Sequence, residues 1–587
     1  MKTSKYLLIT VLTVSLFSGS CKKDFLNTQP LDQFSEDAVW SDPVLAQSFV
    51  NGIYKRLWPS LIHWYMWDAS FVDESTGWYC FNEFQNSLIT ADGIPCWEGQ
   101  TWIDYYLTIR ACNVFMENYN RLPADQATKD FLKGQVHFMR AFNYQTMADL
   151  YGGVPLIKSA YTLTDSFQVP RNTYAETVDF IVADCDSAAM LLPEVQTADN
   201  NGMPTKGAAL ALKSRALLHA ASDLHSNPPL LSGFSNPELL GYTSGDRTAR
   251  WQAAKDAAKA VIDLNLYHLY KASPGVGEDI TQNLVDRYLS KSNEEDIWVR
   301  FFVGKSYENY ANRASGPNGY YGFAHNTPTG DLVDSYEMLD GTKFDWNNPA
   351  HAAEPYKNRD PRLSADIHYE GEKWRKRSSD VLSLDPEGVI QIGDKEVWRN
   401  GQKELVYGLD GKGSPIKGYI GTHTGYYLRK FMDPAYDADI AAQETPWRYF
   451  RYAEILLNMA EACIELHQDD EARTYLNMIR RRAGMPDITE TGTALRDRYR
   501  QERRIELSFE EHRFYDVRRW MIAPDVYKPI SGVSILYKLN PDHTTATVPT
   551  ITSSIVQNRS WQDKIYFFPI LRDEMNKNSK LIQNPGY

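Results

Sequence analysis

Residues 451–486 read RYAEILLNMAEACIELHQDDEARTYLNMIRRRAGMP and carry the clearest structural signal in the chain. Apolar side chains recur there every three or four residues, the spacing that gathers them on one face of a helix. The two apolar stripes consist of Tyr452, Leu456, Met459, Cys463 and Leu466, then Ala472, Leu476, Ile479 and Ala483. A polar turn at 467–470 separates them, and Gly484 and Pro486 end the second helix. The sequence therefore predicts two antiparallel helices that need stacked neighbours to bury their faces.

The same periodicity predicts further helices upstream. Three further helix faces consist of Phe138, Ala141, Phe142 and Ala148; Leu210, Leu217, Ala221 and Leu224; and Ala254, Ala257, Ala258, Val261 and Ile262. Residues 174–192 and 206–224 form a predicted pair, and Gly152-Gly153 ends the helix before it. Paired helices of about 34 residues with alanine at the contacts resemble tetratricopeptide repeats. The spacing between pairs is irregular, which predicts a degenerate array with insertions.

The character of the chain changes between residues 267 and 445, where Gly, Pro, Asn, Asp and aromatic residues dominate. Strand-like runs occur at 297–303 and 388–392. We expect a loop-rich subdomain with small β-hairpins laid over the helical scaffold, and a similar tail from Pro541 onward. The predicted divisions are 1–20 (leader), 21–266 (helices and ligand loops), 267–445 (loop-rich subdomain) and 446–587 (helices and tail).

The amino terminus resembles a bacterial lipoprotein signal. Lys2 and Lys5 precede an apolar run at 6–17, and the small residues 18–20 lead into Cys21. The run is too short to cross a membrane, which takes about 20 apolar residues. We expect cleavage before Cys21 and lipid on its thiol, since two or more acyl chains anchor a protein firmly. The alternative is an ordinary secretory signal followed by a chance cysteine.

Composition limits the classes of partner. The 587 residues are 43% hydrophobic and carry a net charge of −13, which disfavours a general nucleic-acid or anionic-membrane binder. Aromatic residues reach 13%, and their flat faces suit flat apolar ligands. No Cys/His spacing predicts zinc. Cys463 lies on an apolar helix face and is predicted to be a small core residue, whereas Cys80 and Cys96 could form one loop disulfide.

Several segments together resemble the SusD/RagB family, surface glycan-binding lipoproteins of Bacteroidetes that partner a SusC-type outer-membrane transporter. The segments are CKKDFLNTQP (21–30), FMRAFNYQTMADLYGGVPL (138–156), DLVDSYEM (331–338), NRDPRL (358–363), RYAEILLNMAEA (451–462), RRIELSFEEHRFYDVRRW (503–520) and the tail 568–587. The resemblance implies a mostly α fold with four tetratricopeptide-like units and a ligand platform built from loops. It also implies an outward-facing outer-membrane protein with no catalysis and no cofactor.

The richest aromatic segment is 64–102, in which acids and amides are interleaved with rings. Sugar rings pack their C–H faces on indole and phenol planes, while their hydroxyls need polar partners. Glycine and proline flank part of this segment, so our candidate ligand residues there are Trp78, Tyr79, Trp97, Asp73 and Asn82. For the rings beside predicted helices we favour a core role: Trp64, Tyr65, Trp102 and Tyr105.

A second candidate cluster lies in 307–325, where turn residues suggest exposure. We select Tyr307, Tyr320 and Tyr321 from it, and Trp346 is a third candidate with a structural role equally open. The family places ligand loops in roughly these two regions. Those loops are not part of its shared motifs, so no binding residue carries over by position.

The sequence gives weaker signals for catalysis, for an arginine-rich contact surface and for calcium binding. The adjacent acids Asp73 and Glu74 could suggest glycoside hydrolysis, but neighbouring residues seldom hold two carboxyl groups across a bond. The arginines of 496–519 alternate with glutamates, which predicts internal ion pairs. Three aspartates in 433–439 could contact calcium, but they miss the EF-hand spacing, which favours a solvated loop.

We therefore expect a non-catalytic lipoprotein that captures a glycan and presents it to a SusC-like TonB-dependent transporter, as a mobile lid over it. The alternative reading is peptide uptake, with which the RagB side of the family is associated. A peptide would use grooves for backbone hydrogen bonds rather than stacked rings.

Overall fold

The structure is a computed structural model that describes residues 36–55, 57, 67–77, 82–94, 101–226, 228–304, 309–437 and 443–587. The predicted leader, the lipidated Cys21 and the Cys80–Cys96 disulfide lie outside these residues, and so do the indoles of Trp78 and Trp97. Those predictions stay predictions, and so do the predicted domain boundaries.

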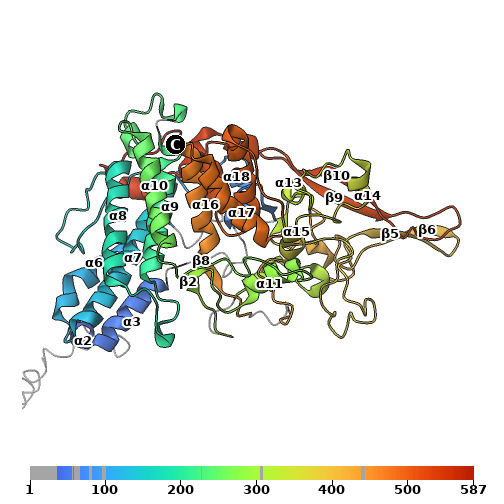
Figure 1. Ribbon diagram of the computed structural model, residues 1–587, viewed down its shortest axis with the longest axis horizontal. Helices are drawn as coiled ribbons and strands as arrows, with labels where there is room; N and C mark the ends of the chain where they lie inside the picture. Colours follow the sequence, from blue (N-terminus) through green and yellow to red (C-terminus); the bar gives the residue numbers. More distant parts are fainter. Residues whose placement is uncertain are drawn as a thin grey trace, which may run out of the picture.

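Helices dominate the molecule (Figure 1). The longer ones are α3 (Pro43–Tyr54), α6 (Trp102–Asn118), α7 (Gln126–Tyr151), α8 (Tyr174–Leu191), α9 (Lys206–Ala221), α10 (Arg247–Ile262), α11 (Ile280–Leu289), α16 (Tyr452–Glu465), α17 (Asp469–Arg482) and α18 (Gly492–Glu506). The shorter ones are α2 (Glu36–Ser41), α4 (Trp67–Ser70), α5 (Asn82–Gln85), α12 (Ala311–Ser315), α13 (Gly330–Ser335), α14 (Pro349–Ala353), α15 (Pro361–Asp366), α19 (Arg513–Arg519), α20 (Ala523–Val526) and α21 (Arg572–Lys577).

The helices stack in chain order, which confirms the predicted array. Helix α6 packs on α7, and the contacts continue through α8, α9 and α10 to α16, α17 and α18 (Figure 1). Local signals begin and end these helices. A capping box of Thr173 and Glu176 starts α8, and α7 ends at Gly152, whose φ of 81° only glycine adopts readily. Helix α10 thus joins the amino-terminal stack to the carboxy-terminal pair.

The predicted hairpin at 451–486 is confirmed as α16 and α17. The turn between them places His467 at a φ of 59°, and Gly484 follows α17 at 71°. Cys463 is fully buried in the core, as its place on the apolar face predicted. The short-range periodicity of this stretch is enough to specify both helices because every signal is local.

Strands are short and lie mostly in and beside the loop-rich region. They are β1 (Ser75–Thr76), β2 (Asp296–Arg300), β3 (Thr327–Pro328), β4 (Ile367–His368), β5 (Asp394–Arg399), β6 (Gln402–Val406), β7 (Tyr427–Leu428), β8 (Trp447–Arg451), β9 (Ile530–Tyr537) and β10 (Thr550–Gln557). The β5–β6 hairpin confirms the predicted small hairpins. With β9 and β10 it forms a sheet in the order β10-β9-β5-β6, which extends away from the helices in Figure 1.

The structure differs from the prediction at two strand-like runs. The run at 297–303 forms β2, but its partner is the distant β8 rather than a neighbouring strand. The run at 388–392 is not a strand. Gly388 has a φ of 73°, and the backbone there crosses 371–374 through only a few hydrogen bonds, such as Ile390 N to Glu372 O at 2.8 Å. The glycine that ends the regular geometry explains the error.

A buried network of ion pairs joins the helical and loop-rich parts. Glu506, at the end of α18, is fully buried and accepts hydrogen bonds from four arginines. The donors are Arg287, Arg451 and Arg482 to Oε1 at 2.6, 2.7 and 2.5 Å, and Arg362 to Oε2 at 3.3 Å. This confirms the prediction of internal ion pairs in 496–519. Within the part of the chain that the structure describes, no helix is both long and apolar enough to cross a membrane.

Candidate functional site

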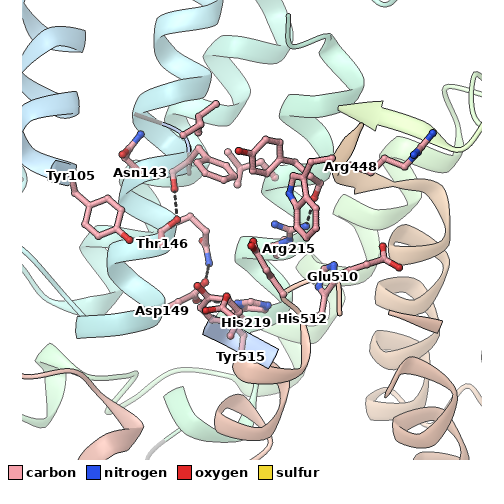
Figure 2. Close-up of a pocket in the computed structure, with 18 residues that line it drawn as sticks. Tyr105, Asn143, Thr146, Asp149, Arg215, His219, Arg448, Glu510, His512 and Tyr515 are labelled. Carbon is pink, nitrogen blue, oxygen red and sulfur yellow. Dashed lines mark hydrogen bonds and ion pairs between the residues drawn. The ribbon is translucent and has the colours of Figure 1, made fainter. Parts of the chain in front are cut away.

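A polar cavity lies where the helical stack meets β8 and the segment after α18 (Figure 2). Helix α7 contributes Asn143, Thr146 and Asp149, and α9 contributes Arg215 and His219. We call this space the inner cavity. Figure 2 shows Asp149, His219, His512 and Tyr515 gathered on one side of it, while the Arg448 side chain points away.

Ion pairs and hydrogen bonds already occupy several polar groups of the inner cavity. His219 Nδ1 lies 2.9 Å from Asp149 Oδ1, and Arg215 donates to both carboxylate oxygens of Glu454 at 2.7 Å. Burial, and then the positive charge of Arg215 and other arginines, lowers the pKa of His512 well below its ordinary value. Burial, and then the negative charge of Glu511, raises the pKa of Asp68 well above its ordinary value. Both shifts favour the uncharged form of the side chain.

The volume of the inner cavity excludes a sugar ring. It is about 90 Å³, room for a few waters at about 30 Å³ each. Sites for small organic ligands start at about 300 Å³. A ligand therefore has to bind outside this cavity.

A larger groove opens beside the inner cavity and shares Leu57 and Tyr449 with it. We call it the outer groove. Its volume is about 370 Å³, and its walls are the end of α3, the turn 201–203, β2 and Phe301. A further hollow of about 270 Å³ continues past the same turn. Together these spaces are large enough for a short oligosaccharide segment.

The outer groove combines rings with polar side chains at its edge. Trp298 and Tyr449 stack with ring centroids 4.4 Å apart, and the Trp298 indole donates to Gly202 O at 3.1 Å. Phe301 is half-buried and lines the groove. The polar edge consists of Asn51, Lys55, Asn201 and Arg300. Amide, ammonium and guanidinium groups beside an aromatic face can pair with hydroxyls around an apolar ring.

Most of the predicted ligand residues cannot be compared with this geometry. Trp78, Tyr79, Trp97 and Tyr307 lie outside the described residues, and Asn82 is described only as the first residue of α5. Trp102 and Tyr105, for which we favoured a core role, are 4% and 7% exposed, which confirms that role. Trp346 donates to Asp334 Oδ2 at 2.9 Å, which is a structural contact.

Asp73 has a structural role that the sequence did not reveal. It is 6% exposed, and Arg513 donates to both its oxygens at 2.9 Å. Arg504 Nη2 lies 2.8 Å away. Burial alone would raise the pKa of Asp73, but the charges of Arg504 and Arg513 outweigh burial and hold it far below its ordinary value. Asp73 therefore remains ionised and clamped.

The raised pKa of the neighbouring Glu74 predicts that folding stability depends on pH. Burial, and then the charge of Asp73, raises the pKa of Glu74 from 4.5 to about 8. Between these values the folded protein keeps a proton that the unfolded chain has released, so stability falls as pH rises, by at most about 1.4 kcal/mol per pH unit. Glu74→Gln should remove this component. We expect urea unfolding at pH 5 and pH 8 to show a smaller pH-dependent loss in the variant; equal losses would contradict the assignment.

The expected exposure of 307–325 is wrong for most of its described residues. Tyr320 is 3% exposed, its hydroxyl donates to Arg375 O at 2.9 Å, and the Arg377 guanidinium lies 3.9 Å from its ring centre. Tyr321 is half-buried and donates to Asp380. The prediction treated the glycines of this segment as signs of exposed turns. Gly319 instead lies at a site of close packing, because a Cβ there would lie 2.5 Å from Leu409 O. Neither tyrosine contributes to the outer groove.

The residues that do line the outer groove were missed. Phe301 and Arg300 belong to the run 297–303, whose apolar character predicted a strand and nothing more. Asn51 and Asn201 are exposed amides on a helix and a turn, and no local pattern distinguishes them from other surface amides. Only the pairing of β2 with β8 brings these segments to one place.

Comparison with known proteins places the chain in a family. The family model described as "SusD family" matches residues 278–587, and the model described as "Starch-binding associating with outer membrane" matches residues 62–218. The first match alone covers more than half of the chain. The chain therefore belongs to the SusD family, which confirms the resemblance found in the sequence.

Individual relatives are similar to this chain along most of its length. A SusD-like protein P2 of Formosa agariphila is 24% identical over 500 residues, 83% of this chain and 80% of its own. A crystal structure of a SusD-like protein from Bacteroides fragilis is 28% identical with a TM-score of 0.73, covering 95% of this chain and 100% of that one. A SusD-like carbohydrate-binding protein from the same species is 22% identical with a TM-score of 0.69, over 92% and 99%. The mostly helical fold with short strands is thus shared.

Proposed function

We propose that this protein is a lipid-anchored, outward-facing outer-membrane protein that captures an oligosaccharide without cleaving it. The outer groove is the observation that carries the proposal. It offers the half-buried ring of Phe301 and a polar edge in a space of about 370 Å³. The family description of starch binding and outer-membrane association supports it, as does the carbohydrate binding of one structural relative. Delivery to a SusC-like TonB-dependent transporter completes the proposal and follows from the resemblance.

The absence of catalysis is supported by the state of the adjacent acids. Asp73 is held by two arginines, and Glu74 is 1% exposed and accepts a hydrogen bond from Phe509 N at 3.2 Å. A glycosidase needs two carboxyl groups facing a bond across an open cleft. Incubation with polysaccharide should therefore release no reducing sugar, and steady release above a heat-denatured sample would contradict this part.

Binding is tested by affinity electrophoresis in gels containing polysaccharide, with starch as the first. We expect Phe301→Ala together with Asn201→Ala to weaken binding at least about tenfold, or ~1.4 kcal/mol, because a stacking face and a hydroxyl partner are lost. Tyr419→Ala is the matched control, since Tyr419 is 76% exposed outside the groove. Binding that falls equally in the control, or not in the double variant, would remove the groove from the proposal.

The aromatic segment outside the described residues is tested separately. Trp78→Ala together with Trp97→Ala should also weaken retardation by the polysaccharide without unfolding the protein. Unchanged retardation would remove these two residues from the site and leave the outer groove as the candidate. Calorimetric titration with peptide mixtures distinguishes the peptide alternative, which predicts heat from peptides and none from glycans.

A further inference from the structure

The outer groove is lined by two cations and by no carboxylate of the described residues. Its basic side chains are Lys55 and Arg300. Acids line both neighbouring spaces: Asp68, Asp149, Glu510 and Glu511 in the inner cavity, and Glu194, Glu294 and Asp296 in the further hollow. The chain as a whole carries a net charge of −13. The groove is therefore a positive site on an acidic protein.

Neither cation has an acidic partner among the described residues. Lys55 is exposed, and no ion pair holds it. Arg300 is half-buried, and its Nη1 donates to an uncharged acceptor, Leu57 O, at 2.5 Å. Arg448, on the facing strand β8, differs because its Nε donates to Asp296 Oδ1 at 2.5 Å. Both positive charges of the groove are thus available to a ligand.

The end of α3 reduces this positive charge without cancelling it. Lys55 caps the helix, and its backbone N–H donates to Ile53 O. The carbonyl end of a helix acts as a charge of roughly −0.5. Two full positive charges outweigh that partial charge, so the groove still attracts an anion.

We propose that the glycan in the outer groove is anionic, and that its carboxylate or sulfate group pairs with Lys55 and Arg300. This inference rests on the proposed function, because it names the substrate class of the same groove. A guanidinium presents its donors as a planar fork that matches two oxygens of an oxyanion. Phe301 follows Arg300 directly and also lines the groove, so an aromatic ring and a charge are offered to the same sugar.

The further hollow limits how closely the anionic groups of the glycan can follow one another. Lys206 lies 2.9 Å from Glu194, which neutralises that acid. Asp296 is neutralised by Arg448. Glu294 is exposed and has no cationic partner among the described residues, so it would repel a second anionic group. We therefore expect a neutral sugar to follow the charged one.

The test compares acidic polysaccharides with neutral polymers of the same backbone in affinity gels. Hyaluronan carries a carboxylate on every second sugar, and its methyl ester is the neutral match. Keratan sulfate carries sulfate and no carboxylate, and desulfated keratan is the neutral match. We expect at least one acidic polymer to bind at least about tenfold more tightly than its match, or ~1.4 kcal/mol, and added salt to reduce the difference. Which acidic polymer binds identifies the group as carboxylate or sulfate. No preference for the acidic polymer in either pair would overturn the inference.

Charge reversal tests whether the preference arises in the groove. Lys55→Glu should remove most of the preference for the acidic polymer, and Glu294→Gln should increase it about twofold. Lys343→Glu is the matched control, because it makes the same change on an exposed loop before α14, far from α3 (Figure 1). The control should keep the preference of the wild type. An undiminished preference in Lys55→Glu would contradict the inference.

The outcomes distinguish this inference from the proposed function. Starch binding that needs Phe301 and Asn201, with no preference for acidic polymers, would overturn the inference alone. Binding of every polymer that is unaffected by changes at Phe301 and Asn201 would remove the groove as a site, and with it both proposals.

Discussion

Replacing Glu506 by alanine is expected to lower the free energy of unfolding by about 3–5 kcal/mol, the usual cost of removing one partner from a buried ion pair. Glu506 is the only ion-pair partner that the described residues give Arg287, which is 1% exposed. Burial, and then the nearby charge of Arg482, already lowers the pKa of Arg287 to about 10. Without the carboxylate the arginines would repel each other in a space that water cannot enter.

The loss is measured as a shift of the urea midpoint. Lys259→Ala is the control, because the Lys259–Asp263 pair is more than half exposed on both sides and is worth little. Glu506→Gln should fall between the two, since it keeps an acceptor and loses the charge. A Glu506→Ala midpoint indistinguishable from that of Lys259→Ala would show that the network does not hold the fold together.

Gly153→Ala is expected to cost at least about 3 kcal/mol, because the new methyl group has no space. A Cβ at this position would lie 2.2 Å from Asn172 O and 2.7 Å from Thr173 C. The backbone cannot shift to relieve the clash. Gly153 N donates to Leu239 O at 2.6 Å, and its carbonyl accepts from Arg171 Nε at 2.7 Å.

Gly52→Ala is the matched control, because it changes a glycine that has open space around it. It lies inside α3, and a Cβ there meets nothing within 4 Å. Alanine should therefore stabilise α3 by about 0.5–1 kcal/mol through its higher helix propensity. Thermal melts of the two variants should shift in opposite directions. A Gly153→Ala protein as stable as the wild type would contradict the packing of this turn.

The helical part could be predicted from the sequence because its signals are short-range. The stripes of α16 and α17, the turn at His467 and the stop at Gly484 lie within 36 consecutive residues. The ion pairs of α18 were predictable only as a class. Alternating Arg and Glu indicates pairing, but the partners Arg287, Arg362 and Arg451 lie far away in sequence.

The site was much harder to predict, for physical reasons. Composition marked Asp73 and Tyr320 as ligand residues, and the structure uses both in buried contacts. An aromatic ring or an acid has the same chemistry in a core as at a binding surface, and burial is decided by residues far along the chain. The outer groove could not be predicted for the same reason, since Asn51, Asn201 and Phe301 meet only through tertiary packing.

The antiparallel pairing of β2 with β8 closes a neck through which the loop-rich region leaves and re-enters the helical body. Arg300 lies opposite Trp447, so the chain between them begins and ends at one point. Closing a longer excursion costs little extra entropy, roughly 0.6 kcal/mol for each doubling of its length. The length and surface of this excursion can therefore change while the stacked helices and most of the outer groove stay as they are, which makes the neck the natural boundary for exchanging the loop-rich region as a unit.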